Sequence, residues 1–126
     1  MTYFFDNNIS DKLVILLKAL DVDARHLKDD FPVDTADVDW LPQVGQKGWT
    51  VVTGDRAIRR RPAELAALKD ANVTALFMKD NFLHRNKWEQ AAWLVRMWRE
   101  IDRQATRLAQ GTIVSVSDRG KLEVLR

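Results

Sequence analysis

Short runs rich in aromatic and β-branched residues recur along the chain and predict the strands of a sheet. Residues that favour turns, mainly Gly, Asp and Asn, bound most of them. The runs occupy residues 2–5, 24–27, 49–53, 73–78, 112–116 and 121–125. The last two flank Asp118-Arg119-Gly120 and predict a C-terminal hairpin.

The segments between the first five runs have apolar residues at helical spacing. Ser10 is expected to cap the first helix, and Thr35 or Asp37 the second, which ends near Gly45 or Gly48. Pro62 is expected to begin the third helix, and residues 84–108 form a long fourth one. This regular alternation predicts a mainly parallel sheet with helices on both faces, in one domain of residues 1–126.

The composition excludes several kinds of site. The chain has 126 residues and no cysteine, which excludes disulfide scaffolds, thiolate zinc sites, iron–sulfur clusters and cysteine nucleophiles. With two histidines, any metal must be held mainly by oxygen. The longest apolar run, Leu13 to Leu17, is too short for a bilayer, and residues 1–6 lack the features of a secretory signal. We therefore expect a cytoplasmic protein with no membrane partner.

Charge is divided unevenly along the chain. Residues 1–55 carry ten acids, all aspartate, and five bases, whereas residues 56–126 carry eight acids and fifteen bases. The net charges of −5 and +7 indicate either an acidic site beside a basic surface or scattered solvated charge.

Four aspartates are candidates for chemistry. Asp6 follows the first predicted strand and Asp55 the third, and parallel sheets have their working sites at the carboxyl ends of strands. Asp37 and Asp39 lie at the start of a predicted helix. Converging carboxylates cannot all stay ionised without a cation between them, and Mg²⁺ or Mn²⁺ would resolve that conflict. The alternative is that these residues are separate helix caps and turns.

Basic residues gather in two places. Arg56, Arg59, Arg60 and Arg61 directly follow Asp55, where they would contact the phosphates of a nucleic acid. A helical projection of the long helix gives a second basic stripe, which is either a solvated face or an RNA contact: Arg85, Arg96, Arg99, Arg103 and Arg107.

Three stretches resemble the PIN-like nucleases. Within this family they are most similar to the PIN-like toxins of bacterial toxin–antitoxin modules. They are Phe4-Phe5-Asp6-Asn7-Asn8, Ala36-Asp37-Val38-Asp39-Trp40-Leu41 and Val51-Val52-Thr53-Gly54-Asp55-Arg56. The continuation to Leu65 is similar to the toxin branch, and the resemblance covers residues 3–115.

The resemblance implies a three-layer α/β/α fold and an endoribonuclease that depends on Mg²⁺ or Mn²⁺ and is silenced by a cognate antitoxin. It implies that Asp6, Asp37 and Asp55 bind the metal and that Asn8 and Thr53 support it. The chain departs from the family in two places. Asn7 stands where related sequences often have an acid, and Asp80 and Asn81 fit the expected fourth acid poorly. Asp39 is expected to supply the missing charge by completing the metal shell or orienting metal-bound water.

The long helix also bears on partners. Trp88, Ala91, Val95 and Trp98 are expected in the core, whereas Trp93 and Met97 project away from that face. They would contact a second copy of the chain or an antitoxin peptide, or be buried beneath the terminal hairpin.

Two other functions fit parts of the sequence. A phospho-accepting receiver domain has the same length and alternation, but it needs an acidic pair where Asp6-Asn7 stands. A PIN-like module that binds RNA or protein without cutting is the other.

Overall fold

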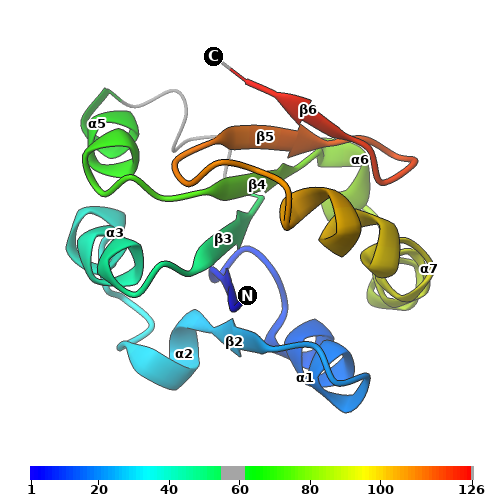
Figure 1. Cartoon of the computed structure of the whole chain (residues 1–126). Coiled ribbons are helices and arrows are strands. Elements are labelled where there is room, and N and C mark those ends of the chain that lie inside the picture. Colours follow the sequence, from blue (N-terminus) through cyan, green and yellow to red (C-terminus); the bar gives the residue numbers. More distant parts are fainter. Residues whose placement is uncertain (55–61, 126) are drawn as a thin grey trace.

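The computed structural model describes residues 1–54 and 62–125, which form a six-stranded sheet between two layers of helices (Figure 1). The strand order is β2-β1-β3-β4-β5-β6, and every neighbouring pair is parallel except β5 and β6. The three-layer fold, the mainly parallel sheet and the terminal hairpin are thereby confirmed. The strands are β1 (Tyr3–Phe5), β2 (Ala24–His26), β3 (Thr50–Thr53), β4 (Ala75–Met78), β5 (Ile113–Val116) and β6 (Leu122–Val124).

Two pairs of helices cover the sheet. The helices α1 (Asp11–Ala19) and α7 (Lys87–Ala105) lie on one face, and α3 (Asp37–Gln46) and α5 (Pro62–Asp70) on the other (Figure 1). Two four-residue helices, α2 (Leu27–Asp30) and α6 (Asp80–Leu83), were not predicted, because one turn is too short to show a period. In the described part of the chain, no helix is both long and apolar enough to cross a membrane.

Alternation along the strands divides the core in two. In β1, Tyr3 and Phe5 belong to the cluster beneath α1 and α7, whereas Phe4 belongs to the one beneath α3 and α5. Successive residues of a strand point to opposite faces, so a short buried strand contributes side chains to both core clusters.

The helix caps agree with the prediction at one helix and differ at another. Ser10 caps α1, its side chain accepting a hydrogen bond from the Lys12 amide. In α3 the cap position is Ala36, which has no side-chain cap bond. The expected cap at Thr35 or Asp37 is therefore wrong: Thr35 donates its hydroxyl to Pro32 O at 2.7 Å, and Asp37 is already the first residue of the helix.

Helix α3 lies very close to the end of α5 at Gly45. A Cβ atom added to Gly45 would be 2.3 Å from the carbonyl oxygen of Ala71. Only a residue without a side chain allows this approach of two backbones.

The apolar face of α7 differs from the predicted one. Trp93 is 3% exposed and donates its indole N–H to Asp118 O at 2.8 Å, and Met97 is half-buried against Gly120 of the hairpin turn. The interface predicted for Trp93 and Met97 is therefore wrong, and burial beneath the hairpin holds instead. Conversely, Trp88, predicted in the core, is 88% exposed, and Val95 is 45% exposed.

Candidate active site

The order of the strands places a topological switch point between β1 and β3. The connection that leaves β1 leads to β2 on one side, whereas the connection that leaves β3 leads to β4 on the other side. In open parallel sheets, ligands bind outside the carboxyl ends of the strands at such a switch point. Asp6 directly follows β1, and Thr53 ends β3.

Asp6 is held at this point through both carboxylate oxygens. Its side chain is buried, with 4% of the residue exposed. Oδ1 accepts the Asn8 amide at 3.0 Å, and Oδ2 accepts the hydroxyl of Thr53, which is itself fully buried. Hydrogen bonds to an ionised group are stronger than neutral ones, so these donors fix the carboxylate in position. Thr53 therefore supports Asp6 with its side chain, and Asn8 does so with its backbone amide.

The loop that follows Asp6 is tied to two other segments. Ile9 N donates to Asp6 O at 3.1 Å, and the Asn7 side chain donates to Val33 O at 2.6 Å, shortly before α3. The ring of His26 accepts the Lys28 amide at Nδ1, so Nε2 carries the proton and donates to Ile9 O at 2.8 Å. His26 is thus a structural residue that holds this loop to the end of β2.

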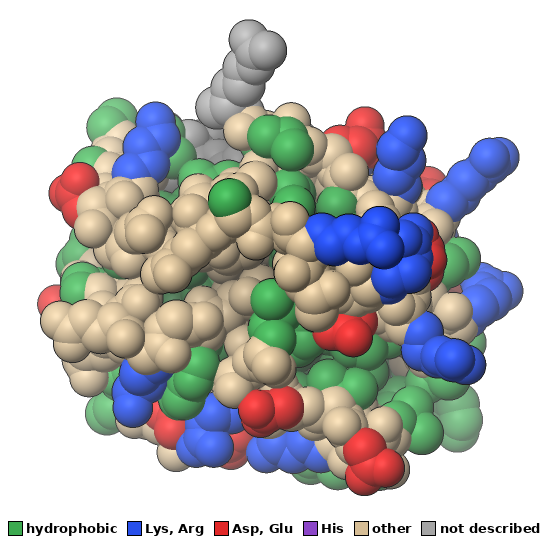
Figure 2. All heavy atoms as spheres, viewed as in Figure 1, with side chains coloured by type: hydrophobic (Ala, Val, Ile, Leu, Met, Phe, Trp, Pro, Cys, Tyr) green, Lys and Arg blue, Asp and Glu red, His purple; other side chains and the backbone are tan. Residues whose placement is uncertain are grey.

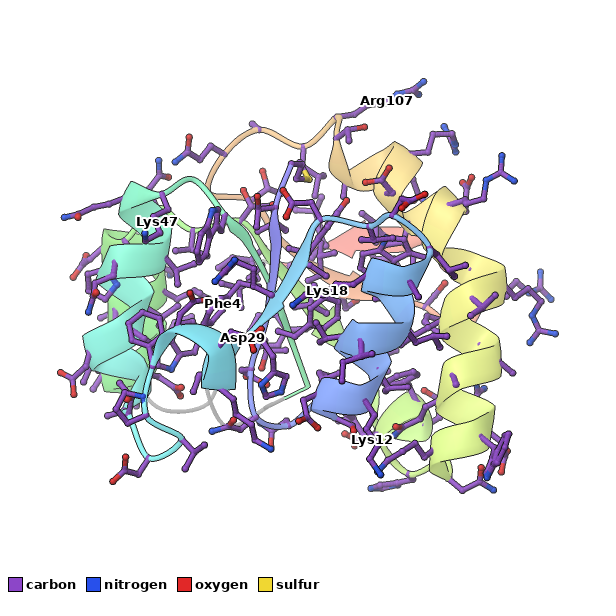
Figure 3. The ribbon with its side chains drawn as sticks, turned by 90° about the horizontal axis from the view of Figure 1, so that it is seen from below. Phe4, Lys12, Lys18, Asp29, Lys47 and Arg107 are labelled. Carbon is purple, nitrogen blue, oxygen red and sulfur yellow. The ribbon has the colours of Figure 1, made fainter. Side chains whose placement is uncertain are left out.

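The same histidine begins the short helix α2 with a capping box. Its backbone amide donates to Asp29 Oδ2 at 2.9 Å, and this bond lowers the pKa of Asp29 below its ordinary value of 3.8. Lys18, 3.5 Å from the same oxygen, lowers the pKa further (both are labelled in Figure 3).

Asp37 is linked to β1 through an aromatic side chain. The Trp40 indole N–H donates to Asp37 Oδ1 at 3.1 Å. The Trp40 ring is fully buried, with its centroid 5.1 Å from that of Phe4, two residues before Asp6 (Phe4 is labelled in Figure 3). The start of α3 is therefore held against the strand that carries Asp6.

Asp39 lies in a different environment from Asp37. It is exposed on the first turn of α3, and its carboxylate makes no hydrogen bond or ion pair with another described residue. The structure gives Asp39 no partner comparable to Trp40.

The rest of the predicted site lies outside the described residues. This holds for the carboxylate of Asp55 and for the whole basic cluster of Arg56, Arg59, Arg60 and Arg61. Among the described side chains, which exclude residues 55–61 and Glu64, no three histidine or acidic groups lie close enough together to hold a metal ion. A three-carboxylate centre on Asp6 and Asp37 would therefore need an acid outside that set, such as the predicted Asp55.

A hollow of about 450 Å³ lies at the carboxyl end of β4. Asp80 and Asn81, the two residues considered for a fourth acid, both line it from the first turn of α6. The Asn81 side chain also donates a hydrogen bond to Asp118 in the hairpin turn. Ser115 and Leu125 complete the hollow from the terminal hairpin, a contact distant in sequence that no local pattern signals.

The second basic region lies away from this edge. Figure 2 shows Lys and Arg side chains gathered on the side of the molecule that α7 occupies in Figure 1. The exposed arginines of this helix and its end are Arg96, Arg99, Arg103 and Arg107. Arg103 forms an ion pair with Glu100 at 2.5 Å, as expected for a solvated face.

Comparison with known proteins supports the two PIN-like interpretations over the receiver domain. A scan against protein-family models matches residues 1–80 to a family described as a PIN-like domain. Searches of curated proteins and of solved structures give no match. The matched region covers more than half of the chain and runs from β1 through β4, so it contains Asp6, Asp37, Thr53 and Asp55. The chain therefore belongs to the PIN-like domain family, whose fold is of the nuclease type.

Proposed function

We propose that this protein is a metal-dependent endoribonuclease of the toxin type, with Asp6, Asp37 and Asp55 as the metal-binding carboxylates. The main support is the position of Asp6. Its carboxylate is buried at the carboxyl ends of β1 and β3 and is fixed by Thr53 and Asn8. Family membership independently supports nuclease chemistry at this edge.

The donor set fits a hard divalent cation. Carboxylate oxygens are preferred by Mg²⁺ and Mn²⁺, and the chain has no cysteine to favour a softer metal. When bound, such an ion supplies positive charge to a phosphoryl oxygen and acidity to a bound water. Asp6 and Asp37 would hold it from the end of β1 and the start of α3, and a hydrogen-bond donor positions each carboxylate.

Other residues would act on the RNA and on partners. In this proposal, Arg56, Arg59, Arg60 and Arg61 hold the phosphate backbone, and Asp39 orients water from its exposed position. The proposed protein partner is a cognate antitoxin, and the proposed location is the cytoplasm. The antitoxin follows wholly from the resemblance to the toxin branch, whereas the role of the arginines follows from their position directly after Asp55.

The test is RNA cleavage by the full chain with Mg²⁺ or Mn²⁺, with and without a chelator. Asp6→Asn, Asp37→Asn and Asp55→Asn should each lower the rate by more than about 100-fold, since even residues that only support metal ligands contribute about 10- to 100-fold. Asp70→Asn, an exposed acid at the end of α5, is the matched control and should cleave normally. Circular dichroism confirms folding.

Three results would count against the proposal. Cleavage that persists in the chelator would exclude the metal, and full activity of any one variant would remove that residue from the site. Metal binding by calorimetry without cleavage would favour the non-catalytic PIN-like module. The position of Asn7, where related sequences often have an acid, is the observation that favours this second candidate.

A further inference from the structure

The outer face of α7 carries an exposed apolar stripe. Trp88, Ala91 and Val95 follow one another at spacings of three and four residues. Trp88 is 88% exposed and Val95 is 45% exposed. Single exposed apolar residues are common, but a stripe at helical spacing that includes tryptophan is typical of a binding surface.

This stripe borders a hollow between the two helices, which we name the α1/α7 groove. Its volume is about 320 Å³, and its lining is Lys12, Leu13, Leu16, Lys87, Trp88 and Ala91. Aliphatic side chains dominate its surface, so it offers little hydrogen bonding to a base or a sugar. A groove of this kind suits the apolar face of a helix, which anchors residues at positions i, i+3, i+4 and i+7.

Two lysines give the groove a positive charge. Lys12 and Lys87 are exposed and lie in the first turns of α1 and α7, where the helix dipole disfavours a cation. Among the described residues, neither forms an ion pair. The neighbouring acids are engaged elsewhere: Asp11 faces Lys28 at 3.7 Å, and Glu89 accepts the Asn86 side chain at 2.6 Å.

The groove lies at the same edge of the sheet as Asp6. Helix α1 follows the carboxyl end of β1, and α7 follows that of β4 through α6. Figure 3 shows Lys12 at the end of α1 that faces the start of α7. An occupant of the groove would therefore reach this edge.

We propose that the α1/α7 groove binds an acidic amphipathic helix of a protein partner. Its apolar residues would pack on Leu16, Ala91 and the indole of Trp88, and its carboxylates would face Lys12 and Lys87. Self-association through the same face would bring these unpaired lysines together, which disfavours a second copy of the chain. The inference goes beyond the nuclease proposal and holds whether or not the chain cleaves RNA.

The probe is a labelled synthetic 16-residue peptide, with Leu at helical positions i, i+3, i+4 and i+7 and Glu at the positions that flank this apolar face. Binding to the full chain is followed by fluorescence anisotropy. Trp88→Ala should weaken it by about 30-fold, as for a tryptophan at the centre of an interface. Lys12→Glu combined with Lys87→Glu should weaken it by about 10-fold or more and remove its salt dependence.

Matched controls separate the groove from general surface effects. Val124→Ala removes an apolar residue that is 68% exposed on β6, and Lys121→Glu reverses an exposed charge near it. Both variants should bind the peptide as the unaltered chain does. Trp88 is so exposed that its replacement leaves the core intact, and thermal melting confirms this.

Several results would overturn the proposal. No binding of the Glu peptide, or equal binding of a peptide with Lys in place of Glu, would exclude an acidic partner. Trp88-dependent binding of oligouridylate RNA or of phosphatidylserine vesicles in place of the peptide would assign the groove to that ligand. Trp88-dependent dimers in sedimentation velocity would assign it to self-association. All of these assays are independent of RNA cleavage, so failure here is distinguishable from failure of the nuclease proposal.

Discussion

The hydroxyl of Thr53 provides the sharpest test of how the candidate site is held. Thr53→Val keeps the shape of the side chain and removes the donor to Asp6 Oδ2 at a position that is fully buried. The same strand contains its own control. Thr50 is also buried, at 2% exposed, but its hydroxyl makes no hydrogen bond to another described residue. Thr50→Val therefore makes the same chemical change at a buried position where the hydroxyl does not donate to a carboxylate.

The expected size of the effect follows from the charge and burial of Asp6. A hydrogen bond to a charged group contributes about 1.5–3 kcal/mol, and at 4% exposure water cannot readily replace the lost donor. We therefore expect Thr53→Val to lower the free energy of unfolding by about 2 kcal/mol. A chain of 126 residues loses about 4 °C of Tm per kcal/mol, so the melting temperature should fall by about 8 °C. Thr50→Val should change the free energy by less than about 0.5 kcal/mol.

Urea denaturation and calorimetric melting at pH 7 measure the difference between the two variants. In an Asp6→Asn background, Thr53→Val should cost less than about 1 kcal/mol, because the acceptor is then neutral. If Asp6 also binds a cation, Thr53→Val should weaken Mg²⁺ binding by about 10-fold or more in titration calorimetry. Equal destabilisation by Thr53→Val and Thr50→Val would refute the assignment of Thr53 as a support of the carboxylate.

Two further predictions concern other parts of the fold. Gly45→Ala should lower the free energy of unfolding by about 2 kcal/mol in urea denaturation, because its Cβ would lie 2.3 Å from the carbonyl oxygen of Ala71, directly after α5. Gln46→Ala, at an exposed position of the same helix, is the control, and an unchanged midpoint for Gly45→Ala would contradict the close approach. Asp29→Ala should destabilise by about 0.5–1 kcal/mol at pH 7 through loss of the capping box. The folded-state pKa of Asp29 is lowered, so the difference in free energy of unfolding between the unaltered chain and Asp29→Ala should be complete above pH 3.8. It should disappear as the pH falls through the folded-state pKa. A difference that grows in acid would contradict the prediction.

The sheet could be predicted from sequence because its signals are local. Each strand is a short apolar run, and the alternation with helices leaves a parallel sheet as the natural arrangement. The proximity of Asp6 and Thr53 follows from the same reasoning, because the carboxyl ends of neighbouring parallel strands meet at one edge. The donor from the Asn8 backbone could not be predicted, since it depends on how the loop after β1 turns.

The faces of α7 could not be assigned from periodicity alone. A helical projection gives the angles between side chains but not which neighbour covers each of them. The β5–β6 hairpin packs over Trp93 and Met97, and its turn accepts the Trp93 indole N–H. This long-range contact moves Trp88 out of the core and creates the exposed edge of the α1/α7 groove.

The helix geometry of α3 also constrains how its two aspartates act. Asp37 and Asp39 are two residues apart, so their side chains leave the helix about 200° apart and do not face each other. The hydrogen bond from Trp40, which packs on Phe4, fixes Asp37 on the side that meets the sheet. Asp39 is exposed on the opposite side of the same turn. A cation held between β1 and α3 would therefore be bound directly by Asp37 but not by Asp39 as well, which leaves Asp39 a role through water.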